Sequence, residues 1–190
     1  MNRAECIVVS GGFDPIHVGH LRMFKEASEL APKLIVIVNN DNFLIEKKGY
    51  VFMPIAERIE IIEGFGVVDM VVESVDKDLT VCETLQWLAK KENVIIFANG
   101  GDRNNTDAIP EADVCRENKI AMKFNVGGGK IQSSSSLVSN EIIKPWGSYK
   151  TFEKDKGFLV KRITIAPGEA LSLQSHKYRS EHWLVASGVA

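Results

Sequence analysis

Apolar and polar positions along the first 140 residues follow two alternating periods. Short, almost wholly apolar runs, such as residues 6–10 (CIVVS) and 33–40 (KLIVIVNN), are typical of strands that are buried on both faces of a sheet. Between them, residues 18–30 carry apolar side chains at the three- and four-residue spacing of a helix. Because strands and helices alternate, the pattern predicts a parallel sheet with right-handed crossovers.

The remaining elements continue this alternation. Strands are expected at residues 67–74, 93–101 and 119–129, and helices at 54–65, 80–91 and 134–143. Pro54 suits the start of a helix, and Gly64 and Gly66 suit its end. We therefore predict an α/β fold of the Rossmann-like type, with a five-stranded parallel sheet and helices on both faces.

The pattern changes near residue 143, where helical periodicity ends. Residues 158–166 (FLVKRITIA), 171–175 (LSLQS) and 182–187 (HWLVAS) show short alternating runs, separated by Pro-Gly and Ser-Gly turns. Such runs predict antiparallel strands. We therefore divide the chain into a first domain at residues 1–142 and an incomplete β domain at 143–190.

Composition narrows the classes of function. The 190 residues are 45% hydrophobic and 25% charged, with a formal net charge of −2, which gives no support for a surface that binds nucleic acid. The three cysteines lie far apart, as expected for thiols in a reducing compartment. We find neither a signal-peptide pattern nor an apolar run of the roughly 20 residues that span a bilayer. We expect a cytoplasmic protein without membrane or nucleic-acid partners.

Chemically versatile residues gather where the predicted strands end, which is where parallel sheets bind ligands. After the first strand, Gly11 and Gly12 allow close approach of a ligand to the backbone, and His17 and His20 follow. After the last strand, a glycine-rich turn leads through Lys130 to four serines at the start of a helix. Helix N-termini attract anions, so these two helix starts predict a cradle for a triphosphate.

Each of these features also has a simpler interpretation. Two histidines at this spacing have no function about as often as they have one. A zinc site is disfavoured because no third Cys or His ligand is nearby in the sequence. One of the serines is expected to cap its helix. Lys47 and Lys48 also fit a solvated loop, and Arg58 also fits a surface ion pair with Glu57 or Glu60.

Four segments together resemble a known family. Residues 11–20 (GGFDPIHVGH) are similar to the HxGH signature of the cytidylyltransferase-like nucleotidyltransferases, and the resemblance covers about residues 5–140. Residues 46–62 (EKKGYVFMPIAERIEII), 97–103 (FANGGDR) and 130–138 (KIQSSSSLV) resemble further motifs of that family in the same order. The chain lacks the Arg or Lys that usually follows the last motif, so Lys130 or Arg103 is expected to bind the γ-phosphate instead.

The resemblance implies transfer of a nucleotide monophosphate, from CTP or ATP, to a phosphorylated small molecule, with release of pyrophosphate. Mg²⁺ is expected to accompany the triphosphate, bound mainly through the oxygens of the substrate. The implied catalytic residues are His17 and His20, as hydrogen-bond donors to the phosphates, and Lys47. Lys47 and Lys48 are expected to close over the phosphates from a mobile loop. The implied nucleotide- and phosphate-binding residues are Gly11, Gly12, Phe13, Asp14, Lys48, Arg58, Gly101, Asp102, Arg103, Lys130, Ser133, Ser134 and Ser135.

The end of the chain resembles a second family. Residues 168–188 are similar to the first cupin motif, and more specifically to the mannose-6-phosphate isomerase cupin that follows sugar-1-phosphate guanylyltransferase domains. By this resemblance Gln174, His176 and Glu181 are metal ligands, for zinc or another divalent ion. The second cupin motif is not in the sequence, so we expect weak metal binding and no isomerase activity from this chain, unless two chains complete each other's barrels.

Three functions therefore stay open. The first is nucleotidyl transfer to a sugar or polyol phosphate, to which the cupin resemblance points only by association. The second is sugar-phosphate isomerisation as the main activity of the intact protein. The third is a regulator that binds a nucleotide or sugar phosphate without turnover. The resemblance also implies a homodimer or a larger homo-oligomer.

Overall fold

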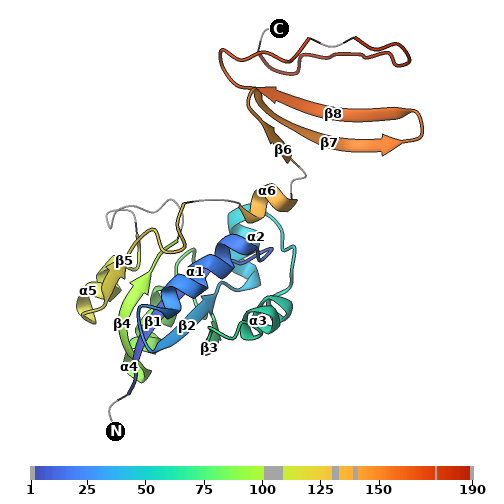
Figure 1. Cartoon of the computed structure of the whole chain (residues 1–190). Helices are drawn as coiled ribbons and strands as arrows, with labels where there is room; N and C mark the ends of the chain where they lie inside the picture. The colour runs from blue at the N-terminus through green and yellow to red at the C-terminus, as the bar shows by residue number, and fades with distance from the viewer. Residues whose placement is uncertain (1–2, 101–108, 130–132, 139–140, 174, 189–190) are drawn as a thin grey trace. The chain divides into compact units, whose positions relative to one another are not determined.

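The computed structural model describes residues 3–100, 109–129, 133–138, 141–173 and 175–188. The chain divides into two compact units, Met1–Ser139 and Asn140–Ala190. Figure 1 shows the helices gathered in the first unit, while the described strands of the second unit form a separate sheet. Each unit is described by itself below.

The first unit is built on a five-stranded parallel sheet in the order β3-β2-β1-β4-β5. Its strands are β1 (Glu5–Gly11), β2 (Lys33–Val38), β3 (Met70–Glu73), β4 (Asn93–Ala98) and β5 (Ala121–Lys123). Its helices are α1 (Val18–Ser28), α2 (Asp41–Lys48), α3 (Ile55–Glu63), α4 (Cys82–Lys91), α5 (Ala112–Glu117) and α6 (Ser134–Val138). This arrangement confirms the predicted Rossmann-like fold.

Helices cover both faces of the sheet because successive side chains of a buried strand point to opposite sides. On one face, Ile7 and Val9 of β1 belong to a core that includes Phe24 of α1 and Ile62 of α3. On the other face, Cys6 and Val8 of β1 pack in a core completed by α4 and α5, through residues Leu85, Leu88 and Cys115. The central strand is therefore buried on both sides, as its continuous apolar run predicts.

Two helices of the first unit were not predicted, and one is shorter than predicted. Lys47 and Lys48 were expected to lie in a loop, but residues 41–48 form α2, which begins after the N-cap Asn40 and ends at Gly49, with a φ of 83°. Asn40 accepts a hydrogen bond from the Phe43 N–H at 2.9 Å, as an N-cap side chain should. The second unpredicted helix, α5, spans only six residues. The predicted helix at 134–143 ends at Val138 as α6, and a strand follows it.

The second unit contains an antiparallel sheet in the order β6-β7-β8, which confirms the predicted change of architecture. Its strands are β6 (Glu141–Lys144), β7 (Gly147–Asp155) and β8 (Phe158–Ile165). The strands predicted at 171–175 and 182–187 are not found among the described residues of those segments. Strands require partners for their ladder hydrogen bonds, and these segments pair with none of the described strands.

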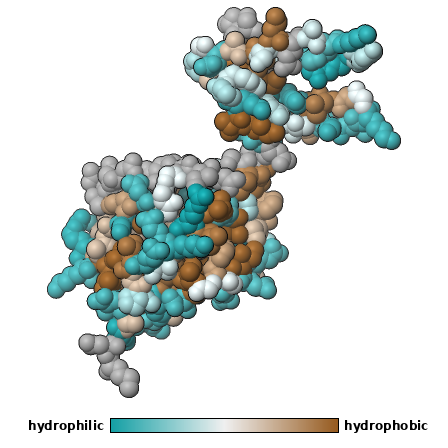
Figure 2. All heavy atoms as spheres, in the orientation of Figure 1, coloured by the Kyte–Doolittle hydropathy of each residue, from teal (hydrophilic) through white to brown (hydrophobic). Residues whose placement is uncertain are grey.

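Apolar side chains are exposed on the second unit, as Figure 2 shows by the hydrophobic residues on its surface. The large hydrophobic side chains that are at least half exposed there are Ile143, Phe152, Leu173, Tyr178, Trp183, Leu184 and Val185. By contrast, the apolar side chains of β1 and β2 in the first unit are buried on both faces of the sheet. In neither unit do the described residues include a helix that is long and apolar enough to cross a membrane.

Candidate functional site

The candidate site is centred on the β1–α1 loop, which we define as residues 11–17. It lies where β1 ends between β2 and β4, at the point where the chain connections change direction across the sheet. Open α/β sheets bind ligands at such switch points. The sheet topology therefore places the candidate histidines at the position where a ligand is expected.

Close packing explains the two glycines that begin this loop. A Cβ atom on Gly11 would lie 2.9 Å from Cζ of Phe13, and one on Gly12 would lie 2.8 Å from Cδ2 of Leu44. Phe13 itself has a φ of 50° and is buried. A side chain at either position would therefore have to displace a buried neighbour, whether or not a phosphate also approaches the loop.

The two histidines are held in one orientation by backbone donors. Nδ1 of His17 accepts a hydrogen bond from the Gly19 N–H at 3.1 Å, and Nδ1 of His20 accepts one from the His17 N–H at 3.2 Å. The rings stack with centroids 3.7 Å apart, and the Phe13 ring meets His20 edge-on at 5.0 Å. Since each Nδ1 is an acceptor, a neutral ring must carry its proton on Nε2. Each histidine can therefore donate a hydrogen bond through Nε2.

Gly19, between the two histidines, makes this arrangement possible. A Cβ atom there would lie 2.9 Å from Cε1 and 3.0 Å from Nδ1 of His17. The His17 ring folds back over the first turn of α1, where it acts as the N-cap. A side chain at position 19 would displace that ring.

Burial keeps both rings neutral at physiological pH. Burial lowers the pKa of His17, and burial together with the neighbouring His17 lowers the pKa of His20 from 6.5 to about 3. Two neutral donors suit a site where negative charge builds up during reaction, because they stabilise it without first requiring a proton.

We expect the stability of the protein to fall as the pH is lowered from 7.5 to 5. The unfolded chain binds a proton at His20 below pH 6.5, whereas the folded chain does not until about pH 3. The contribution of His20 is therefore complete above pH 6.5 and is lost toward pH 3, with a slope of at most about 1.4 kcal/mol per pH unit. Urea denaturation at several pH values measures this slope.

The matched controls for that experiment are two glutamine variants. His20→Gln should flatten the pH dependence between pH 7.5 and 5. His182→Gln removes an exposed histidine of the second unit and should leave the slope unchanged. Equal slopes for the wild type and His20→Gln would show that His20 is not the buried neutral group described here.

Asp14 connects the β1–α1 loop to the segment that follows α2. Its carboxylate is 1% exposed and accepts hydrogen bonds from the N–H groups of Phe52, at 3.0 Å, and Met53, at 2.6 Å. It also forms a 2.7 Å ion pair with Lys48. Burial by itself raises the pKa of Asp14, but the hydrogen bond from Lys48 and those from the two amides outweigh it, so the pKa is lowered. Asp14 is thus a buried anion that orders the loop.

The two candidate lysines lie in the last turn of α2 and not in a loop. Nζ of Lys48 is held by the Asp14 carboxylate, donates to the Asp14 carbonyl at 2.8 Å, and lies 4.8 Å from the centroid of the Tyr50 ring. Nζ of Lys47 lies 5.3 Å from the centroid of the Phe43 ring. The structure therefore replaces the predicted mobile lysine loop with a helix that is attached to the β1–α1 loop.

Arg58 is fully buried, and its contacts differ from the phosphate contact predicted for it. Its guanidinium donates to the carbonyls of Met53, Gly12 and Asn39 at 2.7–2.9 Å and forms a 2.5 Å ion pair with Asp41. A guanidinium with these partners does not face an acceptor phosphate. The ion pair with Glu57 or Glu60, which was the alternative for Arg58, is replaced by the pair with Asp41.

The last predicted motif contacts the β1–α1 loop directly. Oγ of Ser134, at the start of α6, donates to the Pro15 carbonyl at 2.9 Å. In the glycine-rich turn before it, Gly127 has a φ of 93°, and a Cβ atom there would lie 2.9 Å from the backbone nitrogen of Met23. Its N–H donates to Glu26 of α1 at 2.8 Å. Gly127 is therefore needed to pack this turn against α1.

Several predicted site residues are not placed by the structure. Gly101, Asp102, Arg103, Lys130 and Gln174 lie outside the described residues. Ser133 and Ser135 lie beside Ser134 at the start of α6 and are partly or largely exposed. The proposed roles of these residues stay predictions.

Sequence reasoning missed two carboxylates that hold the site together. Asp41 begins α2 and pairs with Arg58, and Glu26 on α1 binds the glycine-rich turn. The Asn-Asp pair at residues 40–41 is a helix-start signal that could have revealed α2 and, with it, Asp41. Glu26 had no such signal, because its partner is about 100 residues away in the sequence.

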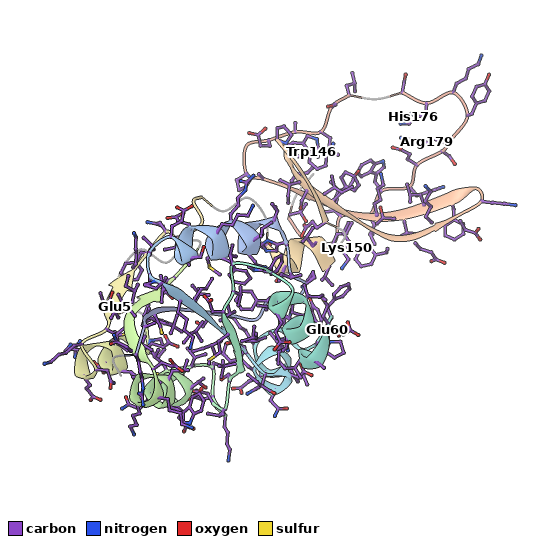
Figure 3. The ribbon with its side chains drawn as sticks, turned by 60° about the horizontal axis from the view of Figure 1, so that its bottom comes forward. Glu5, Glu60, Trp146, Lys150, His176 and Arg179 are labelled. Carbon is purple, nitrogen blue, oxygen red and sulfur yellow. The ribbon has the colours of Figure 1, made fainter. Side chains whose placement is uncertain are left out.

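Of the three residues predicted to bind metal, His176 and Glu181 lie close together, and Gln174 lies outside the described residues. Nε2 of His176 lies 3.3 Å from Oε1 of Glu181, and the guanidinium of Arg179 contacts both, at 2.5 and 2.7 Å. Figure 3 shows His176 and Arg179 side by side. Across the described residues of both units, no three His, Cys, Asp or Glu side chains are grouped so that they could hold a metal ion.

This result also bears on the Mg²⁺ that the resemblance implies. In the first unit, the Asp14 carboxylate is engaged by Lys48 and two amides, so it is not available as a ligand. That the triphosphate carries its Mg²⁺ mainly on its own oxygens stays an expectation.

Comparison with known proteins gives relatives that are much longer than this chain. The xanthan biosynthesis protein XanB of Xanthomonas campestris pv. campestris (strain B100) is 50% identical over 99 residues, which are 52% of this chain and 20% of XanB. Mannose-1-phosphate guanylyltransferase 2 of Escherichia coli O157:H7 is 42% identical over 62 residues, which are 32% of this chain and 13% of that protein. The chain thus spans a fifth or less of these curated relatives.

A solved structure and two family models complete the comparison. The lipopolysaccharide core biosynthesis protein from Thermoplasma volcanium GSS1 superposes with a TM-score of 0.54 at 18% identity, over 65% of this chain and 96% of that one, which shows a shared fold. Residues 132–190 match the C-terminal domain of mannose-6-phosphate isomerase. Residues 8–144, which are most of the chain, match the cytidylyltransferase-like model. The protein therefore belongs to the cytidylyltransferase-like family.

Proposed function

We propose that this protein transfers a nucleotide monophosphate from a nucleoside triphosphate, CTP or ATP, to the phosphate of a sugar or polyol phosphate, with release of pyrophosphate. The observation that carries the proposal is the histidine pair at the sheet switch point. Each ring is neutral, has its Nδ1 occupied by a backbone N–H, and so has its proton on Nε2.

The reaction is a single displacement at phosphorus. A phosphate oxygen of the acceptor forms a bond to the α-phosphorus, and the bond from that phosphorus to the bridging oxygen breaks. The electron pair of the broken bond stays with the leaving pyrophosphate. His17 and His20 donate through Nε2 to the α- and β-phosphate oxygens as charge builds up on them. The protein therefore acts by positioning and by stabilising charge, with no covalent intermediate.

We propose that Lys47, in the last turn of α2, contacts the phosphates, as the resemblance implies. Lys48 of the same turn is paired with Asp14. Mg²⁺, when bound with the triphosphate, would neutralise charge on its oxygens. Gly101, Asp102 and Arg103 are proposed nucleotide contacts, and Lys130, Ser133, Ser134 and Ser135 are proposed phosphate contacts.

The acceptor class is proposed from the second unit and from the relatives. Residues 132–190 match a sugar-phosphate isomerase domain, and three relatives are named for a sugar phosphate, mannose 1-phosphate. The shorter matches to such relatives span 50–62 residues, about the length of this C-terminal segment. The names of these relatives therefore support a sugar phosphate as the acceptor more strongly than they support a guanine nucleotide as the donor. CTP and ATP stay the proposed donors.

A pyrophosphate-release assay tests the proposal. The four nucleoside triphosphates are combined with Mg²⁺ and with a panel of sugar and polyol phosphates. We expect pyrophosphate with CTP or ATP that depends on a sugar or polyol phosphate. Activity with GTP alone would overturn the choice of nucleotide, and binding without turnover in any combination would favour the regulator.

The match to the isomerase domain favours a second candidate function for a longer form of the protein, which is metal-dependent sugar-phosphate isomerisation. For this chain, the expectation of weak metal binding stays a prediction. Conversion of mannose 6-phosphate by the purified 190-residue chain would contradict our expectation of no isomerase activity.

A further inference from the structure

Arg58 has an unusual set of partners for a side chain with no exposed surface. Nε donates to the Met53 carbonyl at 2.9 Å, and Nη1 donates to the carbonyls of Gly12 and Asn39, both at 2.7 Å. Nη2 pairs with the Asp41 carboxylate at 2.5 Å. A buried guanidinium is costly unless it is paired and hydrogen-bonded, and Arg58 satisfies both conditions.

These partners belong to three segments that each carry or hold a candidate catalytic group. Gly12 precedes Phe13, whose ring contacts His20. Asp41 begins α2, and the last turn of that helix carries Lys47 and Lys48. Met53 belongs to the segment whose amides bind Asp14. The Arg58 guanidinium thus joins three parts of the chain. They are the β1–α1 loop, the helix α2, which carries Lys47 and Lys48 and which we call the lysine helix, and the segment that follows this helix.

Helix α2 is consequently held at both ends. At its start, Asp41 pairs with Arg58 of α3, and at its end, Lys48 pairs with Asp14 of the β1–α1 loop. At eight residues, α2 is shorter than the roughly 12–15 residues at which isolated helices become even marginally stable in water. Its position relative to the histidines therefore depends on these two ion pairs together with its own packing.

We propose that Arg58 is a positioning residue that fixes the lysine helix α2 relative to the histidines of the β1–α1 loop, and that it acts on catalysis without touching the substrate. This inference rests on the proposed function for its effect on turnover. The structural part of the inference, that Arg58 links the three segments, does not depend on the proposed function.

The test compares Arg58→Met with Arg116→Met. Arg116 also forms an ion pair with an aspartate, Asp113, but both side chains are more than three-quarters exposed and lie on α5. We expect Arg58→Met to lower kcat by about 10²-fold with little change in KM for the nucleotide, since a small misplacement of reacting groups has an effect of that size. Arg116→Met should keep the wild-type kcat.

Amide hydrogen exchange provides a readout that does not depend on activity. In Arg58→Met, the amides of residues 12–14 and 49–53 should exchange faster than in the wild type, while the strands β1 and β4 stay protected. If the wild type shows no turnover with any substrate, the proposed function fails, and hydrogen exchange alone still decides whether Arg58 links these segments. Unchanged exchange, or a folded Arg58→Met variant with wild-type kcat, would overturn the inference.

Should Arg58→Met fail to fold, Asp41→Asn and Arg58→Lys serve in its place. Asparagine at position 41 keeps a side-chain oxygen that can accept from Nη2, and Arg58 keeps its three carbonyl acceptors, so this change disturbs the fold less than the loss of the guanidinium does. Arg58→Lys keeps the positive charge but cannot reach four acceptors on three segments. Both variants should lower kcat more than KM, and wild-type kcat in both would again contradict the positioning role.

Discussion

Replacing His20 with alanine is expected to lower kcat for nucleotidyl transfer by about 10²–10³-fold, which is the effect of removing one well-placed donor to developing charge. His20 is the more deeply buried member of the pair, with its Nδ1 bound to the His17 N–H and its ring against Phe13. The Nε2 donor therefore has a fixed direction, and water cannot replace it with the same geometry. Steady-state kinetics with pyrophosphate detection measures the loss.

Two amide variants separate the donor role of His20 from its role in the helix cap. His20→Gln can place an N–H where Nε2 was, whereas His20→Asn can keep an acceptor where Nδ1 was. We expect the glutamine variant to retain more activity than the asparagine variant. Thermal unfolding confirms that each variant is folded. Wild-type turnover in a folded His20→Ala variant would remove the histidine from the mechanism.

Replacing Asp14 with alanine is expected to lower the free energy of unfolding by about 3–5 kcal/mol, the usual effect of removing one partner of a buried ion pair. The change leaves the Lys48 ammonium, whose side chain is only 17% exposed, without its carboxylate. It also removes the acceptors of the Phe52 and Met53 amides. Urea denaturation at pH 7, where the lowered pKa of Asp14 keeps the wild-type carboxyl ionised, measures the difference.

Asp113→Ala is the matched control for Asp14→Ala. Asp113 also pairs with a basic residue, Arg116, but its side chain is 78% exposed. Exposed ion pairs contribute about 0–1 kcal/mol, so this variant should keep nearly the wild-type stability. Equal losses from the two variants would contradict the account of Asp14 as the buried anchor of the β1–α1 loop.

The fold of the first unit could be predicted because its strands are apolar on both faces and its longer helices are periodic. The run at residues 33–40 has few interpretations other than a buried parallel strand, and it forms β2. Helix α2 was missed because its eight residues carry little amphipathic pattern and it is stabilised by contacts that are distant in sequence. In the second unit, the alternation of apolar and polar residues predicted strands at 171–175 and 182–187. This pattern does not show whether partner strands exist.

The site could be predicted as a set of residues but not as a set of contacts. The positions of His17 and His20 followed from a glycine-rich strand-to-helix turn, which local sequence reveals. The buried ion pair between Arg58 and Asp41 joins residues 17 apart on two different helices, and no local pattern records it. Arg58 was therefore assigned to a phosphate, although its four partners belong to the protein.

The most direct test of the central claim is the fate of the α-phosphorus. The protein is incubated with Mg²⁺, a sugar phosphate and a nucleoside triphosphate labelled at the α-phosphate, and the products are separated and identified by mass spectrometry. We predict that the label moves into a nucleoside diphosphate sugar and that one pyrophosphate is released for each product molecule. Release of inorganic phosphate with the label left in a nucleoside diphosphate, or no product with any acceptor, would contradict it.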